Sequence, residues 1–260
     1  MAWSLWFALI PFSFLCFCLA WLIQKRTGDA AIVDVFWPYV VGASGAIVAY
    51  WGTGDDGRRA LLGILALLWG VRLGTHILTD RVLTPGHEDR RYTQMRDDWG
   101  DLFQLLIFRF YQYQGISVFG LSLVFIAIAA NPAPLGTFAI LGALVVVFGV
   151  IGETLADQQL QAWRFNPDNK GKSCRGGLWA VSRHPNYFFE WLVWVGWAIM
   201  AFSTPYWGFV GLLPVGIMYV AMNYFTGIPP NERQNLIARS DYSLYQSEVS
   251  AFFPWFPKQT

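Results

Sequence analysis

The chain is dominated by long apolar runs, each about the length that crosses a lipid bilayer. Of its 260 residues, 55% are hydrophobic and only 13% are charged. A transmembrane helix needs about 20 consecutive, mainly apolar residues, and runs of this kind recur along the whole sequence. Inside lipid every backbone polar group must be satisfied within the segment, which favours helices. The sequence therefore predicts an all-α, polytopic membrane protein.

We expect seven transmembrane helices. They cover residues 2–23, 32–51, 60–78, 115–130, 136–155, 186–202 and 206–225. We expect the first run to be a retained span rather than a cleaved signal peptide, because no basic residues precede it and it exceeds the usual apolar region of about 7–15 residues.

The basic residues of the connecting segments indicate an orientation. Lys25 and Arg26 follow the first run, four arginines lie between residues 81 and 96, and five basic residues lie between residues 164 and 183. By the positive-inside rule these segments are cytoplasmic. The N-terminus is then outside and the C-terminus cytoplasmic. Without a long linker or a convincing repeat, residues 1–260 are expected to form a single membrane domain.

Charge and cysteine usage narrow the possible partners. The formal net charge is +1, which gives no reason to propose nucleic acid. The three cysteines and three histidines show no spacing typical of a zinc site, so no metal is expected. We expect a monomer in contact with membrane lipid.

A stripe of polar residues ends the fifth run. Glu153, Asp157, Gln161 and Arg164 follow one another at intervals of four, four and three, so they lie on one face of a helix. One interpretation is an ordinary helix end solvated at the membrane surface. The other is one wall of a ligand site.

The loop after this stripe favours a ligand. Lys170, Gly171 and Lys172 place two cations beside a glycine, and Gly176 and Gly177 allow a close approach of the backbone. Such a loop suits phosphate. Neither a P-loop nor a Rossmann fingerprint is present.

A dense polar motif, residues 182–187, begins the sixth run. Pro185 suits the first turn of a helix, whose free N–H groups attract anions. Asn186 and Glu190 are four residues apart and share a face. The alternative for Glu190 is an internal pair with Arg183 or His184. Further polar side chains follow the seventh run, among them Asn231, Arg233 and Tyr242.

These motifs together resemble the C-terminal domain of the steroid 5α-reductase family, and particularly its bacterial branch. The resemblance is carried by Glu153, Asp157, Arg164, residues 169–171, 177–179, 182–187, Glu190, 227–230, Tyr242, Tyr245 and 253–254, with weaker likeness at residues 33–38 and at Glu88 to Tyr92. Members of that family use NADPH to reduce a carbon–carbon double bond conjugated to a ketone, within a seven-helix membrane fold. One departure is Phe189, where the family commonly has glycine; it either narrows the site or faces lipid.

The resemblance implies that residues 131–260 bind NADPH and that residues 1–130 form a chamber for a steroid-like lipid. The implied cofactor residues are Asp157, Arg164, Lys172, Trp179, Arg183, His184, Asn186, Tyr187, Glu190, Asn231, Arg233 and Tyr242. It also implies a bacterial inner membrane location, with the cofactor site facing the cytoplasm.

On the substrate side, an enone reductase needs a hydrogen-bond donor where negative charge develops on the ketone oxygen. Asp34 is our leading candidate, because a carboxyl group within a membrane run is expensive unless it is functional or paired. A structural pair of Asp34 with Arg72 is the alternative. Trp37 and Trp69 either donate to the carbonyl or line the chamber. The expected catalytic set is Asp34, Trp37, Trp69, Arg72 and Glu190.

Two other functions stay open. An enzyme resembling isoprenylcysteine carboxyl methyltransferases would share the Arg-His-Pro-x-Tyr motif and use S-adenosylmethionine, but it would not explain the lysine loop. A non-enzymatic lipid-binding or transport protein would use Asp34 and Arg72 as transport residues, although we find no paired broken helices.

Overall fold

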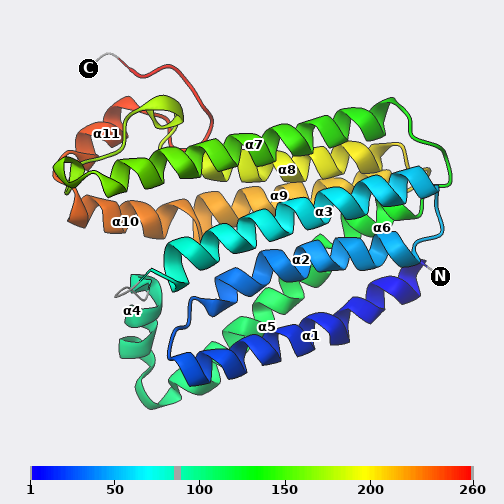
Figure 1. Cartoon of the computed structure of the whole chain (residues 1–260), viewed down its shortest axis with the longest axis horizontal. Coiled ribbons are helices and arrows are strands. Elements are labelled where there is room, and N and C mark those ends of the chain that lie inside the picture. Colours follow the sequence, from blue (N-terminus) through cyan, green and yellow to red (C-terminus); the bar gives the residue numbers. More distant parts are fainter. Residues whose placement is uncertain (1, 85–88, 259–260) are drawn as a thin grey trace. The chain divides into compact units, whose positions relative to one another are not determined.

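The computed structural model describes residues 2–84 and 89–258, and in this part of the chain the regular structure is helical (Figure 1). Glu88 lies outside the described residues. The α-helices are α1 (Ala2–Thr27), α2 (Ile32–Trp51), α3 (Asp56–Ile77), α4 (Arg90–Trp99), α5 (Phe103–Leu121), α6 (Leu123–Ala129), α7 (Thr137–Phe165), α8 (Pro185–Phe202), α9 (Leu212–Val220), α10 (Ile228–Ala238) and α11 (Tyr242–Glu248). Short π or 3₁₀ turns extend several of them, including η4 (Gly177–Ala180) and η6 (Ala221–Phe225).

Six helical stretches among the described residues are long and apolar enough to cross a membrane. They are Trp3–Thr27, Ile32–Trp51, Asp56–Val82, Arg90–Ala129, Thr137–Phe165 and Gly208–Ala238. The sixth predicted span forms α8, but its first turns carry Asn186 and Glu190, and it is not among the six. An all-helical integral membrane protein is thus supported. A seventh span and the orientation stay predictions.

The chain divides into two compact units. The first contains the residues up to Ile140 together with Met200–Gly211, and the second contains Leu141–Ile199 together with the residues from Leu212 onward. One boundary between the units lies within α7, and the expected division of function at residue 130 stays a prediction. Each unit is described by itself below.

In the first unit, α2 and α3 pack with their backbones in close contact. A Cβ added at Gly70 would lie 2.5 Å from the carbonyl oxygen of Pro38 and 2.9 Å from Cα of Gly42. A Cβ at Gly45 would lie 2.5 Å from that of Ala66. Small residues permit this approach, which is the usual way in which helices pack within a membrane.

Two arginines at the start of α3 hold the nearby loops. Arg58 is 2% exposed and donates to the carbonyl oxygens of Ala133 and Pro134 at 2.6 and 3.0 Å. Arg59 donates to three carbonyl oxygens at the end of α2. The unpaired carbonyls of a helix end need such donors, so these charges have a structural role.

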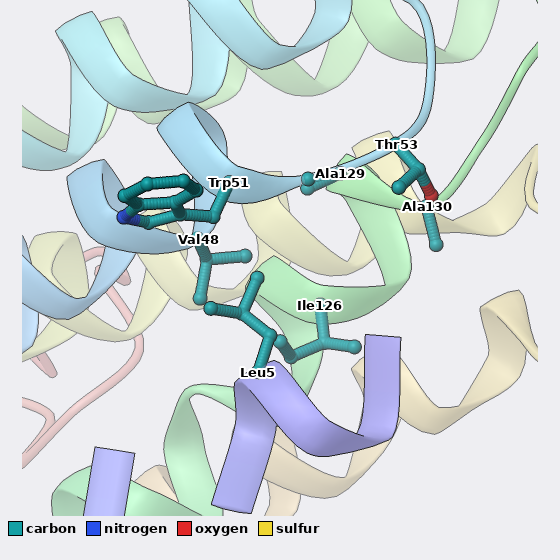
Figure 2. A pocket seen from close by; sticks show the side chains of 8 residues that line it. Leu5, Val48, Trp51, Thr53, Ile126, Ala129 and Ala130 are labelled. Carbon is teal, nitrogen blue, oxygen red and sulfur yellow. The ribbon is translucent and has the colours of Figure 1, made fainter. Parts of the chain in front are cut away.

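A very small apolar cavity of about 10 Å³ lies at the same end of α2, beside α1 and α6. Figure 2 shows Leu5, Val48 and Ile126 lining it, with Trp51 and Thr53 nearby. All its lining side chains are uncharged. A cavity of this size is about that of one water molecule, so it has no room for a lipid substrate and no titratable group for chemistry.

In the second unit, glycines bring α7 and α8 together. A Cβ added at Gly149 would lie 2.9 Å from the carbonyl oxygen of Phe189, and one added at Gly152 would lie 2.2 Å from its ring. Phe189 is 7% exposed and also makes an edge contact with Phe148. The phenylalanine that departs from the family pattern thus fills the space above Gly152. Its burial does not favour a lipid-facing ring, and whether it narrows the site stays a prediction.

Candidate functional site

The candidate site in the second unit is built around a contact between α7 and α8. Asp157 lies near the end of α7 and is 7% exposed, and Asn186 follows Pro185 at the start of α8. The Asn186 side-chain nitrogen donates to Asp157 Oδ1 at 3.3 Å. The other amide atom, Asn186 Oδ1, is buried and has no hydrogen-bond partner among the described residues. An acceptor in this state is unusual and requires an explanation.

Two further carboxyl groups are buried on the same two helices. Glu190 lies one turn after Asn186, is 5% exposed and accepts a hydrogen bond of 2.9 Å from Nε1 of Trp194. Glu153 lies one turn before Asp157 and is 4% exposed. Of the predicted polar stripe, Glu153 and Asp157 are thus buried, while Arg164 is exposed. A solvated helix end does not describe this arrangement.

Arg183 is held by the protein itself. Its Nε and Nη2 donate to Glu232 Oε1 on α10 at 2.7 and 2.6 Å, and Nη1 donates to the carbonyl oxygens of Gln246 and Val249. The Arg183 side chain is 9% exposed. These bonds show that Arg183 connects three segments of the chain. Its role as a cofactor contact stays a prediction.

His184 shares the same carboxylate. Its Nε2 lies 3.4 Å from Glu232 Oε1, and its ring stacks on Tyr187 with centroids 5.5 Å apart. Burial lowers the pKa of His184 below its usual value, and the positive charges of Arg183 and Arg239 act in the same direction, although Glu232 opposes the shift. The ring is therefore neutral near pH 7, with Nε2–H directed to Glu232.

Trp179 braces the turn before α8. It is 7% exposed, and its indole nitrogen donates to the carbonyl oxygen of Ala156 on α7 at 2.9 Å. Next to it, Gln159 accepts a hydrogen bond from the backbone N–H of Leu178, and Gly177 takes a positive φ of 58°. Stacking of Trp179 on a cofactor stays a prediction, and burial of its ring does not favour it.

The other residues expected at the cofactor site, Asn231, Arg233 and Tyr242, lie on α10 and α11. Asn231 donates to the Tyr187 hydroxyl at 2.7 Å and to the carbonyl oxygen of Gly227 at 2.9 Å. Tyr242 is 1% exposed and packs with Tyr245 and Val249. Burial raises the pKa of Tyr242, so it is a neutral core phenol near pH 7. Arg233 is exposed on α10.

The loop that carries Lys170 and Lys172 is ordered by contacts with both ends of α11. Ser173 donates to the Asp241 carboxylate through its N–H at 3.0 Å and its hydroxyl at 2.8 Å, and Arg175 pairs with Glu248 at 2.6 Å. These bonds leave Lys170 and Lys172 exposed on either side of Gly171, whose φ is 75°. The loop therefore presents both ammonium groups on a fixed backbone.

All the residues expected at the cofactor site lie in the second unit, with Arg164, Lys172 and Arg233 exposed and the others wholly or partly buried, and their convergence on one site stays a prediction. Glu232, Gln246, Ser173 and Asp241 had no assigned role in the sequence interpretation, although they organise this region. Gln246 Nε2 donates to Glu232 Oε2 at 2.9 Å. In the sequence, the signal for Glu232 is an acidic residue beside Asn231, after the seventh predicted span.

In the first unit, Asp34 is the centre of an ionic cluster. Its carboxylate accepts hydrogen bonds from Arg81 at 3.0 Å, from Arg91 at 2.7 Å and from the Tyr92 hydroxyl at 2.8 Å. Asp89 also pairs with Arg91 at 2.8 Å. These hydrogen bonds occupy both oxygens of the carboxylate, so the structure does not favour Asp34 as the donor to a substrate ketone. Its catalytic role stays a prediction.

The other residues of the expected catalytic set in this unit lie on α2 and α3. Trp37 donates from Nε1 to Ser117 at 2.9 Å and makes an edge contact with Trp69, with centroids 6.0 Å apart. Trp69 is fully buried, whereas Arg72 is half-buried. These contacts favour the interpretation of the two tryptophans as walls.

Comparison with known proteins adds two relatives. An uncharacterized protein of Schizosaccharomyces pombe is 24% identical over 93% of this chain and 77% of its own length. Steroid 5-alpha-reductase DET2 of Gossypium hirsutum is 38% identical over a segment that covers 26% of each chain. The second likeness is thus confined to about a quarter of either protein.

A family model described as a protein of unknown function, DUF1295, matches residues 20–249. The match spans both units described above. The chain therefore belongs to the DUF1295 family.

Proposed function

We propose that the protein is an NADPH-dependent reductase of a carbon–carbon double bond conjugated to a ketone, acting on a 3-oxo-Δ4 steroid or a similar polycyclic lipid. Support comes from the partial likeness to a steroid 5-alpha-reductase and from the residues of the second unit. As part of this proposal the protein is a monomer of a bacterial inner membrane, with its cofactor site facing the cytoplasm.

The observation that carries the proposal is the buried, unpartnered Oδ1 of Asn186. The carboxamide of a nicotinamide has both a donor and an acceptor, and its NH₂ group matches such an oxygen. Glu190 lies one helical turn further along the same face and is an acceptor for the same group. Asp157 holds the Asn186 nitrogen, so the oxygen is the atom left to face a ligand. These two acceptors fit the NH₂ group at the nicotinamide end of the cofactor.

The exposed cations fit the other end of the molecule. NADPH carries a pyrophosphate and a 2′-phosphate, which need several positive charges. Arg164, Lys172 and Arg233 are exposed on α7, the following loop and α10, all within the second unit. The loop bearing Lys172 is held by Ser173 and Asp241. A prearranged loop reduces the ordering that binding would otherwise require.

The chemistry follows from these contacts. When bound, NADPH would supply the hydride for the β-carbon of the enone, and the proton added at the α-carbon would come from water. Asn186 and Glu190 orient the nicotinamide amide, and the cations hold the phosphates. The saturated ketone is the product.

The proposal is tested by thermal unfolding of the purified protein in detergent with NADPH, NADH or S-adenosylmethionine, because a ligand of the native state raises apparent stability. We expect NADPH to give the largest rise and S-adenosylmethionine none. Asn186→Ala should remove most of the rise with NADPH, whereas Gln234→Ala, which removes a side-chain amide from α10, should retain it. Stabilisation by S-adenosylmethionine alone would instead support a methyltransferase. No stabilisation by any of the three would favour a lipid-binding or transport protein.

A further inference from the structure

The segment after α11, residues 249–257, has two different sides. Its inner side is tied to the turn before α8: the N–H of Arg183 donates to Ser250 O at 2.8 Å, and Ser182 Oγ donates to Phe252 O at 2.9 Å. The N–H of Trp255 donates to Val181 O at 2.9 Å. Phe252 is 4% exposed and contacts the rings of Phe188, Trp191 and Tyr219.

The outer side of this segment presents large aromatic rings to the surroundings. Phe253 is 48% exposed, Trp255 71% and Phe256 83%. The backbone beneath them is fixed by the bonds described above, so these rings are not a loose tail. In water, so much exposed aromatic surface would be unfavourable, and contiguous apolar patches of this kind mark a surface that contacts something else.

The aromatic side continues an apolar stripe of the preceding span. Leu213, Ile217, Val220 and Tyr224 recur at intervals of four, three and four, and each is 40% exposed or more. They belong to the stretch Gly208–Ala238, which is long and apolar enough to cross a membrane. The stripe meets the C-terminal segment through Tyr219, whose ring lies 6.4 Å from that of Tyr224 and 6.2 Å from that of Phe253.

We propose that residues 253–256 lie in the lipid headgroup layer and anchor the second unit at the membrane surface. Tryptophan and other aromatic side chains are enriched at this depth, because their rings are apolar while an indole N–H can remain hydrated. Pro254 and Pro257 remove two backbone N–H groups that would need partners there. Lys258 follows, exposed, and its ammonium can reach lipid phosphate.

This anchor has a consequence for the polar motif at the start of α8. Because the same segment bonds to Val181, Ser182 and Arg183, its depth in the membrane sets the depth of that turn. The anchor depends on the exposed rings and on the span beside them. It does not depend on which ligand the motif binds.

The test is site-directed spin labelling of the full chain in phosphatidylcholine nanodiscs. Cys16, Cys18 and Cys174 are replaced by alanine, and a single cysteine is placed by Trp255→Cys or Phe256→Cys, both at well exposed positions. Leu213→Cys on the lipid-facing stripe and Ser240→Cys, exposed in the turn after α10, are the reference positions. The ratio of oxygen to nickel-chelate collision rates reports the depth of each label.

We expect labels at positions 255 and 256 to show a several-fold higher ratio than the label at 240 and a lower ratio than the label at 213, as for the headgroup layer. A ratio equal to that at position 240 would place the segment in water and overturn the proposal. Spin–spin broadening at position 255 would show that a second copy covers the rings, and this would also overturn it. Circular dichroism of each labelled variant verifies that the helices are retained.

Discussion

The guanidinium of Arg183 donates to the carboxylate of Glu232 through two nitrogens, at 2.7 and 2.6 Å from Oε1. The pair connects the turn before α8 with α10, and the third nitrogen of Arg183 extends the connection to the carbonyl oxygens after Tyr245. Both side chains are less than one-fifth exposed. A single ion pair therefore holds together three segments that carry the polar motif.

Replacement of Glu232 tests the importance of this pair. Glu232→Gln leaves a buried guanidinium without its counter-charge, which typically costs about 3–5 kcal/mol. Glu248→Gln is the matched control, because its partner Arg175 is 32% exposed and such pairs contribute about 0–1 kcal/mol. Equal losses in unfolding free energy for the two variants would contradict a special role for Glu232.

The stability of the protein should depend on pH through His184. Burial lowers the pKa of His184 in the folded state, so its stabilising contribution is fully present above the unfolded pKa of about 6.5. As the pH falls below that value, the unfolded chain gains a proton that the folded protein resists, and stability is lost. We expect the melting temperature to fall between about pH 7.5 and 5.5 in the wild type.

His184→Gln is the comparison for the pH experiment, because it retains a donor toward Glu232 and has no group that titrates in this window. Its melting temperature should fall less over the same interval. A slope as steep as that of the wild type would assign the effect to another group.

The contact between Gly152 and Phe189 predicts a suppressor pair. Gly152→Ala would place a methyl group 2.2 Å from the Phe189 ring, and overpacking of this kind costs typically about 1–3 kcal/mol. Phe189→Ala alone would leave a cavity, whereas in combination with Gly152→Ala it should restore part of the loss. Gly216→Ala on α9 meets nothing within 4 Å and should be neutral or stabilising. Additive losses in the double variant would disprove the contact.

The cluster around Asp34 can be separated into its ionic and hydrogen-bond parts. Tyr92→Phe removes the 2.8 Å hydrogen bond to Asp34 and should cost about 1–3 kcal/mol. Asp34→Asn removes the charge that Arg81 and Arg91 share, so it should cost more. Unfolding in detergent gives both values. A smaller loss of unfolding free energy for Asp34→Asn than for Tyr92→Phe would show that the charge of Asp34 contributes little to stability. That result would favour its predicted catalytic role.

The sequence predicts contacts between residues that are close along the chain better than contacts between residues that are far apart along it. The long helices follow from apolar runs. Asn186 and Glu190 lie on one face because helix geometry relates residues four apart. The partners of Asp34 lie 47, 57 and 58 positions away, and Glu232 lies 49 positions from Arg183. No local pattern relates such residues.

Packing explains the other differences. The role of Phe189 depends on which residue of α7 lies opposite it, and that is set by the register of two helices. The resemblance implies that Trp179 contacts the cofactor, yet the turn before α8 directs its indole to Ala156. A polar motif predicts the location of a candidate site. It does not predict which of its residues contact a ligand and which hold the backbone in place.

The central claim, transfer of hydride from NADPH to an enone lipid, is tested most directly with NADPH deuterated at the transferable position of the nicotinamide. The purified protein is incubated with a 3-oxo-Δ4 steroid, and the product is analysed by mass spectrometry. We predict a saturated ketone with one deuterium at the former β-carbon, formed by the wild type and by Gln234→Ala but much more slowly by Asn186→Ala. Recovery of unchanged steroid from the wild type, although NADPH stabilises it, would contradict this substrate class. Equal deuterium incorporation by Asn186→Ala would contradict the assigned site.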